Sequence, residues 1–264
     1  MVTFESLKKE LLEIVNKTLD RCEKQWENTL GQDELLKKAM REAFAARTNI
    51  PGHPYLDENQ YKSDQFVAFM LDMRDSTKHL RQAISHRIAR VSQMQRVFYE
   101  VSALLPAMAK VINEYNGAVT EYLGDGLLAL FQLPKEKKAQ ELVLYNVLDA
   151  ARTCMDALHQ VVNVVLKTRY NLPPLQIGIG LAFSDAIISH FGLSPDTQVK
   201  VIGQCIYFAS QCSKGRNQII VHEWLENIWP TSKEGKLRFI PKQFSDFKGY
   251  IIEQDSSKGV TISV

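Results

Sequence analysis

Residues 121–131 read EYLGDGLLALF, a segment in which two glycines interrupt two potential strands. Gly124 and Gly126 flank Asp125, and glycine tolerates the backbone angles that a tight reversal needs. Residues 118–123 before the turn and 127–131 after it have the apolar character of strands. We therefore expect a β-hairpin that carries the carboxylate of Asp125 at its tip.

A second strand upstream also ends in a carboxylate. Residues 66–72 read FVAFMLD, which predicts a buried strand closed by Asp72. If this strand pairs beside the hairpin, Asp72 and Asp125 meet. Two adjacent carboxylates repel each other unless a cation lies between them, and hard oxygen ligands suit Mg²⁺ or Mn²⁺. Taken singly, each aspartate would also fit an ordinary turn or cap.

The remaining pattern predicts an α+β fold. Helical periodicity follows Ser76 and continues, with a break, to about Tyr115; a long amphipathic helix is expected over 138–169 and further strands over 175–181, 199–202 and 218–221. The order strand, helices, hairpin, helix, strand is typical of a ferredoxin-like core, an antiparallel sheet with helices on one face.

The first 58 residues differ from the rest. Residues 4–46 repeat apolar side chains at three- or four-residue steps, with an interruption at 31–33, and predict two helices. A connection rich in proline and glycine follows at 49–54. We expect residues 1–58 to form a helical appendage and linker, and residues 59–264 to form the main domain. The apolar stripe of the first helix either packs on that domain or forms a dimer seam.

Composition excludes several classes of function. The chain has 32 Lys and Arg against 30 Asp and Glu, so a broad basic surface for nucleic acid is not expected. The four cysteines lack metal-ligand spacing and fit buried thiols in a reducing cytosol. The start lacks a signal peptide, and no stretch is long and apolar enough to span a membrane. These features predict a cytoplasmic protein.

Four segments in sequence order resemble the catalytic domain of class III nucleotidyl cyclases, over residues 62–253. The segments are 69–77, similar to the first metal strand of the family (FxDIxGFT); 121–131, similar to its second metal hairpin; 178–192, similar to GIxxGxxxxGxxG; and 199–211, similar to YDxxGxxVNxASR. The hairpin is not the GG[DE]EF motif of diguanylate cyclases. The resemblance implies a cyclase core with the α+β fold described above.

The resemblance also implies a reaction and a set of ligands. Two divalent cations, Mn²⁺ or Mg²⁺, would assist attack of the ribose 3′-hydroxyl on the α-phosphorus, closing a 3′,5′-cyclic nucleotide and expelling pyrophosphate. In the family, one subunit supplies the metal half of each site and the other supplies the base-reading half, which implies a homodimer. The metal ligands would be Asp72, Met73 and Asp125. Backbone N–H groups of Met73, Ser76 and Thr77, at the start of a helix, would bind the triphosphate. The side chain of Lys248, near the C-terminus, would also hold its phosphates. For Lys248, a solvated surface lysine is the alternative.

Two residues in the base-reading positions bear on the substrate. Glu121 and Lys200 stand where adenylyl cyclases have Lys and Asp, so adenine would require rearrangement, whereas uracil matches the pair directly. Cytosine and guanine can also use the pair. By strand parity Glu121 shares a face with Val119, so we expect this lone charge to have a partner. Tyr207 replaces the Asn of the family, and its bulk favours a pyrimidine.

This combination resembles the pyrimidine cyclases of bacterial Pycsar antiphage defence, which make cUMP or cCMP to trigger an effector. It favours UTP, then CTP, with a purine cyclase (guanylate or adenylate) as the alternative. Gln211 replaces the transition-state arginine of the family. Arg74 is the expected substitute, with Arg81 and Arg216 as alternatives, although Arg74 could simply pair with Asp75. Together with Tyr207, Gln211 also fits a catalytically silent, nucleotide-binding dimer. The six histidines lack ligand spacing, and His79, His86 and His159 are expected on helix surfaces.

Overall fold

A computed structural model describes residues 3–28, 48–56, 60–81, 91–193, 197–230 and 237–254. Its strands form one sheet with the order β2-β3-β1-β4-β6-β8-β7 and with β5 paired to β4. The strands are β1 (Lys62–Met73), β2 (Ala118–Tyr122), β3 (Gly126–Gln132), β4 (Ile177–Phe191), β5 (Gln198–Gly203), β6 (Gln218–His222), β7 (Leu237–Gln243) and β8 (Lys248–Gln254). Every described pairing is antiparallel except that of β4 with β6.

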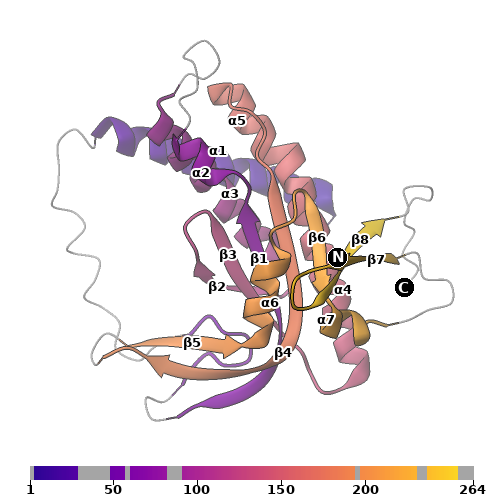
Figure 1. Cartoon of the computed structure of the whole chain (residues 1–264). Coiled ribbons are helices and arrows are strands. Elements are labelled where there is room, and N and C mark those ends of the chain that lie inside the picture. Colours follow the sequence, from indigo (N-terminus) through magenta and orange to yellow (C-terminus); the bar gives the residue numbers. More distant parts are fainter. Residues whose placement is uncertain are drawn as a thin grey trace.

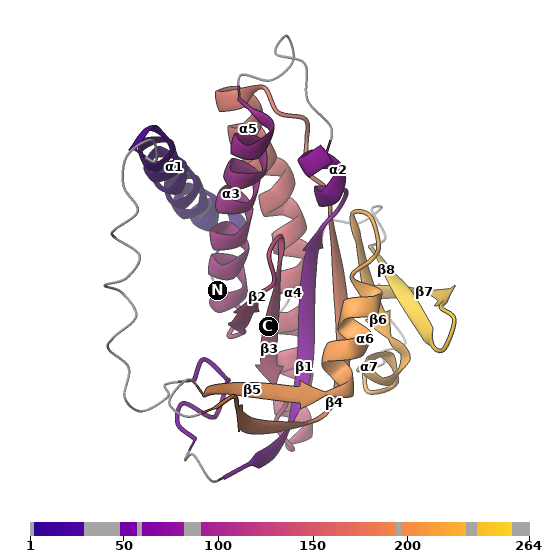
Figure 2. The same ribbon diagram turned by 60° about the vertical axis from the view of Figure 1, so that its left-hand side comes forward.

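Helices cover both faces of this sheet, but unequally. The helical elements are α1 (Phe4–Asn28), α2 (Ser76–Arg81), α3 (Gln93–Glu114), α4 (Lys137–Ala157), the π-helical turn η2 (Leu158–Val162), α5 (Asn163–Tyr170), α6 (Gln204–Cys212) and α7 (Glu223–Asn227). Figure 2 shows α3 and α6 on opposite sides of β1. The predicted α+β fold is confirmed, and α6 adds a helix on the second face.

The sheet alternates between two cores, as the two-residue period of a strand requires. On β1, Val67, Phe69 and Leu71 are buried in the main core beneath α3 and α4. Phe66 and Met70 belong to a smaller core on the α6 side. Asp72 continues the second series, so its carboxylate lies on the α6 face of the sheet.

The N-terminal helix is part of the main core. Its stripe of buried side chains consists of Leu7, Leu11, Val15, Leu19 and Cys22. The hydrophobic effect over these side chains holds α1 against α3. Packing on the domain, one of the two predicted alternatives, is therefore what the structure shows. The second predicted helix, Glu34–Ala46, lies outside the described residues, and the division at residue 58 stays a prediction.

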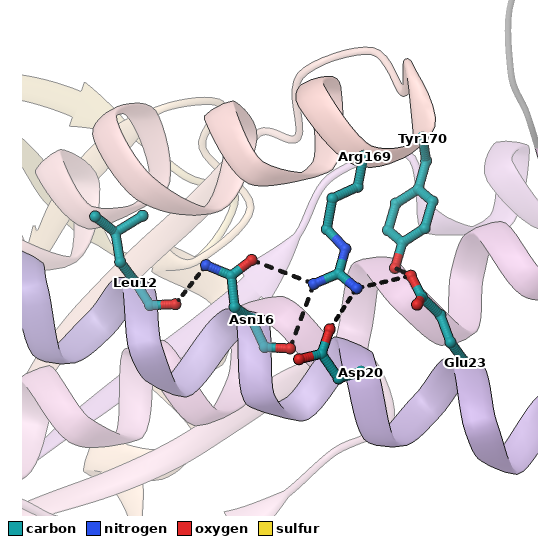
Figure 3. Close-up of polar contacts among 6 residues, drawn as sticks. All are labelled: Leu12, Asn16, Asp20, Glu23, Arg169 and Tyr170. Atoms are coloured by element: carbon teal, nitrogen blue, oxygen red, sulfur yellow. Dashed lines mark hydrogen bonds and ion pairs between the residues drawn. The ribbon is translucent and has the colours of Figure 1, made fainter.

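Polar contacts fasten the same helix to the end of α5 (Figure 3). Arg169 donates to Asn16 Oδ1 at 3.2 Å, to Asp20 Oδ1 at 2.5 Å and to Glu23 Oε1 at 2.9 Å. The hydroxyl of Tyr170 donates to the same Glu23 oxygen at 2.5 Å. One arginine thus spans about two turns of α1, which fixes the helix along its axis as well as against the core.

Two details differ from the sequence prediction. The predicted helix over 138–169 runs through α4, η2 and α5, and it contains a π-helical turn in its middle. The strand predicted over 175–181 continues to Phe191 and forms a hairpin with β5 (Figure 1). Within the described ranges, no helix has both the length and the apolar character needed to cross a bilayer.

Candidate active site

Asp72 lies near the end of β1, and Asp125 lies in the turn that leads into the neighbouring strand β3, so the hairpin pairs beside the first strand as predicted. Asp72 is in register with Gly126, the residue that follows Asp125 in the hairpin. The N–H of Met73 donates to the carbonyl of Asp125 at 3.3 Å. A Cβ on Gly126 would lie 2.5 Å from the carbonyl oxygen of Leu71, so only glycine lets the hairpin approach this closely. Both carboxylates are consequently held at one end of the β1–β3 pair.

Arg74 brings a positive charge to this pair. Its guanidinium forms an ion pair with Asp72 Oδ2, and its side chain is only 15% exposed. Burial lowers the pKa of Arg74, while the negative charges of Asp125 and Asp75 oppose that shift. The predicted alternative, in which Arg74 pairs with Asp75, is not found among the described ion pairs. Arg74 instead belongs to the aspartate site.

The carboxylate of Asp75 forms ion pairs with two other cationic side chains. Arg216 lies 2.7 Å and Lys78 2.9 Å from its carboxylate oxygens. Hydrogen bonds from these two side chains hold the pKa of Asp75 well below its usual range. Arg216 is one of the alternatives for the missing transition-state arginine. Its guanidinium is paired with Asp75, three residues after Asp72. The side chain of Arg81, the other alternative, lies outside the described part of the chain.

The expected phosphate-binding backbone lies at the start of α2, where Ser76 and Thr77 follow directly on Asp75. Asp75 adopts a left-handed φ of 61°, and its carbonyl accepts hydrogen bonds from the N–H groups of Lys78 and His79. This turn places Ser76 and Thr77 next in sequence to the aspartate site. The side chain of Met73 is buried in the main core, so this residue can offer a metal only its backbone carbonyl.

Glu121 and Lys200 form an ion pair, with Oε2 and Nζ 2.9 Å apart and both side chains half-buried. The expectation that Glu121 has a partner is confirmed. The expected strand parity is wrong, because a β-bulge at Thr120 separates Glu121 from Val119. Val119 pairs with Ala129 and contacts the main core, whereas Glu121 pairs with Leu128 on the α6 side. The bulge thus turns Glu121 onto the face that carries Asp72.

The other expected substrate residues lie along α6 and β8. Tyr207 is 53% exposed, and Gln211 accepts a hydrogen bond from Lys214. Lys248 is exposed at the start of β8, and β4 and β6 lie between its strand and β1. Three strand spacings correspond to about 14 Å. The structure therefore does not bring Lys248 to the aspartates of its own chain.

A buried charged cluster behind α2 was not predicted. Glu100 of α3 has no exposed surface, accepts a hydrogen bond from Arg96 Nε at 2.7 Å and lies 2.8 Å from Nδ1 of His79. The prediction that His79 lies on a helix surface is wrong, because its ring faces this carboxylate. His159 is exposed, as predicted, and His86 lies outside the described residues. The four-residue spacing of Arg96 and Glu100 was the one visible sequence clue.

The donor set fits a hard divalent cation. Across the described ranges, no group of three or more His, Cys, Asp or Glu side chains converges. Two carboxylates and one backbone carbonyl suit Mg²⁺ or Mn²⁺, since Mg²⁺ usually binds through one or two carboxylates and completes its shell with water and substrate phosphates. Asp72, Asp125 and the carbonyl of Met73 match that pattern.

Solved structures similar to this chain include nucleotidyl cyclases. The guanylyl cyclase Cya2 matches with a TM-score of 0.60 at 16% identity, covering 76% of this chain and 98% of that one. The adenylyl cyclase CyaB from P. aeruginosa matches with 0.58 at 14% identity, covering 75% and 98%. A rhodopsin-guanylyl cyclase core with converted specificity, in complex with ATPαS, matches with 0.55 at 11% identity, covering 74% and 99%. The chain has the class III nucleotidyl cyclase fold.

At these identities the likeness establishes the cyclase fold alone. No protein-family profile matches the sequence, and no curated protein matches it. The matched structures are covered almost completely, so this chain contains the whole of that cyclase fold together with additional residues.

Proposed function

We propose that this chain is a metal-dependent nucleotidyl cyclase that converts a nucleoside triphosphate to its 3′,5′-cyclic monophosphate and pyrophosphate. The observation that carries the proposal is the placement of Asp72 beside the Asp125 hairpin within a cyclase fold. In the reaction, O3′ of the ribose bonds to the α-phosphorus, the bond from that phosphorus to the bridging oxygen of the β-phosphate breaks, and the hydroxyl proton is released.

The site residues would share this work. Asp72, Asp125 and the carbonyl of Met73 would hold two divalent cations, Mn²⁺ or Mg²⁺. When bound, these ions lower the pKa of the attacking hydroxyl and offset the charge on the phosphates. Backbone groups at Ser76 and Thr77 would face the triphosphate. Arg74, which pairs with Asp72, would offset charge at the α-phosphate in place of the family arginine that Gln211 replaces.

We propose a pyrimidine substrate, with UTP favoured over CTP. The Glu121–Lys200 pair supports this choice, because an acceptor and a donor 2.9 Å apart can bridge the adjacent N3–H and carbonyl of uracil. Tyr207, exposed on α6, would narrow the base site. A purine remains the alternative, since guanine can use the same pair and the matched structures include guanylyl and adenylyl cyclases.

We also propose a homodimer with composite sites. The distance of Lys248 from the aspartates of its own chain supports this arrangement, because a lysine that holds phosphates would then serve the site of a second copy. Mixing Asp72→Ala protein with Lys200→Ala protein tests the arrangement. Each variant alone should be inactive, and hybrid dimers with one intact site should restore activity. No activity despite demonstrated subunit exchange would contradict it.

The direct test of function is product identification. The protein is incubated with all four ribonucleoside triphosphates and Mn²⁺, and cyclic products are identified by mass spectrometry. We expect cUMP as the main product, and we expect Asp72→Ala to abolish it. Full turnover by Asp72→Ala would refute the metal assignment. Nucleotide binding without any cyclic product would instead support a catalytically silent dimer, the reading that Gln211 favours.

The proposed biological role is antiphage signalling in the cytoplasm, in which the cyclic product and not direct contact reaches an effector. This role is supported by the resemblance of the sequence to Pycsar cyclases. Bacteria that express the chain should accumulate the cyclic pyrimidine after phage infection, as measured by mass spectrometry of cell extracts. No accumulation during infection by several unrelated phages would contradict the role while leaving the enzymatic proposal intact.

A further inference from the structure

The aspartate site already contains a cation that belongs to the chain. The guanidinium of Arg74 pairs with Asp72 Oδ2 and interacts electrostatically with Asp125. Its backbone is fixed on both sides, since the N–H of Arg74 donates to the carbonyl of Gln176 at 2.7 Å and that of Met73 donates to Asp125. The side chain is therefore held where two neighbouring carboxylates need a positive charge.

The adjacent carboxylate of Asp75 forms no described ion pair with Arg74. Asp75, the other acidic residue beside it, is taken by Arg216 and Lys78. At the same time, Nε of Arg74 is buried and has no hydrogen-bond partner among the described residues. A buried N–H without a partner is destabilising, because it has lost its hydrogen bonds to water. Arg74 thus places its positive charge beside the two carboxylates, while its Nε–H donates no hydrogen bond to a described residue.

We infer that Arg74 is a built-in counter-cation of the metal site, one that neutralises the Asp72–Asp125 pair until a divalent cation displaces it. This inference rests on the proposed cyclase function. The guanidinium occupies Asp72 Oδ2, one of the oxygens that a metal ion would use, and its positive charge repels an incoming cation, so the two cations compete. Once displaced, the guanidinium has five N–H donors and lies two residues before the start of α2, where it can pair with phosphate oxygens.

Such a competition couples two binding events. Metal binding frees Arg74 for the triphosphate, and a triphosphate that engages Arg74 vacates the carboxylates for the metal. Because coupling between two ligands is reciprocal, each should strengthen the binding of the other by the same factor. Without Arg74, metal should bind more tightly to the nucleotide-free protein, and the mutual strengthening should shrink. A merely structural ion pair would predict neither change.

Metal affinity measured without turnover tests the inference. Free Mn²⁺ is titrated by electron paramagnetic resonance against the full-length protein, with Asp72→Asn to assign binding to this site. An opposite charge beside a carboxylate shifts its proton affinity about 10- to 1,000-fold. We therefore expect Arg74→Met to bind Mn²⁺ at least about tenfold more tightly than the unaltered chain, and Arg74→Lys to fall between the two.

Arg216→Gln is the matched control, because it removes a nearby positive charge that is bound to Asp75 and not to Asp72. It should change Mn²⁺ affinity by less than about threefold, because the exposed charge of Arg216 is screened by solvent and Lys78 remains paired with Asp75. Asp72-dependent binding that is equal or weaker in both Arg74 variants would overturn the inference and leave the proposed function standing. If neither the unaltered chain nor any Arg74 variant shows Asp72-dependent Mn²⁺ binding, the proposed function fails as well.

Discussion

Nδ1 of His79 lies 2.8 Å from Oε2 of Glu100, a carboxylate with no exposed surface. His79 belongs to α2, the helix that begins just after the first aspartate, and Glu100 belongs to α3 in the main core. Arg96 completes the cluster by donating to the second oxygen of Glu100. This contact links α2, the helix at the proposed phosphate-binding end of the site, to the core of the domain.

Loss of Glu100 should therefore destabilise the fold strongly. Glu100→Ala leaves Arg96 buried without its partner, and removing one member of a buried ion pair costs about 3–5 kcal/mol. Urea unfolding measures the change. Glu114→Ala, on the same helix and in a more exposed pair with Lys110, should cost less than about 1 kcal/mol. Equal losses for the two variants would contradict the assigned role of Glu100.

Removing side-chain volume from the buried face of α1 should also destabilise the whole domain. Leu11→Ala deletes a side chain with no exposed surface from the main core, and such substitutions cost about 2–5 kcal/mol. Lys17→Ala, on the exposed face of the same helix, should change stability by less than about 0.5 kcal/mol. The comparison is made by chemical denaturation. A negligible effect of Leu11→Ala would show that α1 is dispensable for folding.

Stability should fall below neutral pH through His222. Burial lowers the pKa of this histidine, which stacks on Phe208 with ring centroids 4.0 Å apart. The unfolded chain therefore takes up the proton at a higher pH than the folded chain does. The stabilisation that comes from neutral His222 has its full value when the pH is above the pKa of this histidine in the unfolded chain, about 6.5. It decreases as pH falls from there toward the folded pKa, by at most about 1.4 kcal/mol per pH unit.

His222→Asn isolates this effect, because asparagine can still accept the hydrogen bond from the N–H of Trp224 but does not titrate. Urea unfolding of both proteins at pH 7.5 and 5.5 gives the pH dependence of each. The loss on acidification should be smaller in the variant. An equal loss in both proteins would assign the acid sensitivity to other groups.

Exchanging the charges of the Glu121–Lys200 pair should change base preference. Glu121→Lys combined with Lys200→Asp places the two residue types in the order that the resemblance assigns to adenylyl cyclases. The ratio of kcat/KM for UTP to that for ATP should fall at least about tenfold, since unpaired polar groups in a base site are strongly discriminated against. Parallel assays with both triphosphates measure the ratio. An unchanged ratio would show that the Glu121–Lys200 pair does not determine which base is bound.

Local sequence signals predicted the part of the site that depends on local structure. Asp72 and Asp125 were found because an apolar strand and a glycine turn each identify their own carboxylate, and the register of β1 with β3 then brings them together. The bulge at Thr120 was missed, because one extra residue in a strand leaves no trace in an alternating pattern. Its consequence, the orientation of Glu121, was therefore missed too.

Contacts distant in sequence were beyond the same reasoning. His79 and Glu100 are 21 residues apart and belong to different helices, so no periodicity relates them. The strands β7 and β8 were not predicted; β7 contains Pro241, which is unusual within a strand, and none of its residues is buried. Pairing with β8 at one edge of the sheet, and not burial, accounts for this strand.

The seating of α1 limits how this chain can be joined to another protein. A module fused in place of α1 would strip the apolar cover from α3 and remove the partners of Arg169. A module attached ahead of Phe4 would leave both intact and would pull or twist directly on a helix that is fixed to α3 and α5. Glu100 connects α3 to His79 of α2, and α2 follows directly on β1. A force applied to α1 would therefore be transmitted through packed helices to the end of β1 that carries Asp72.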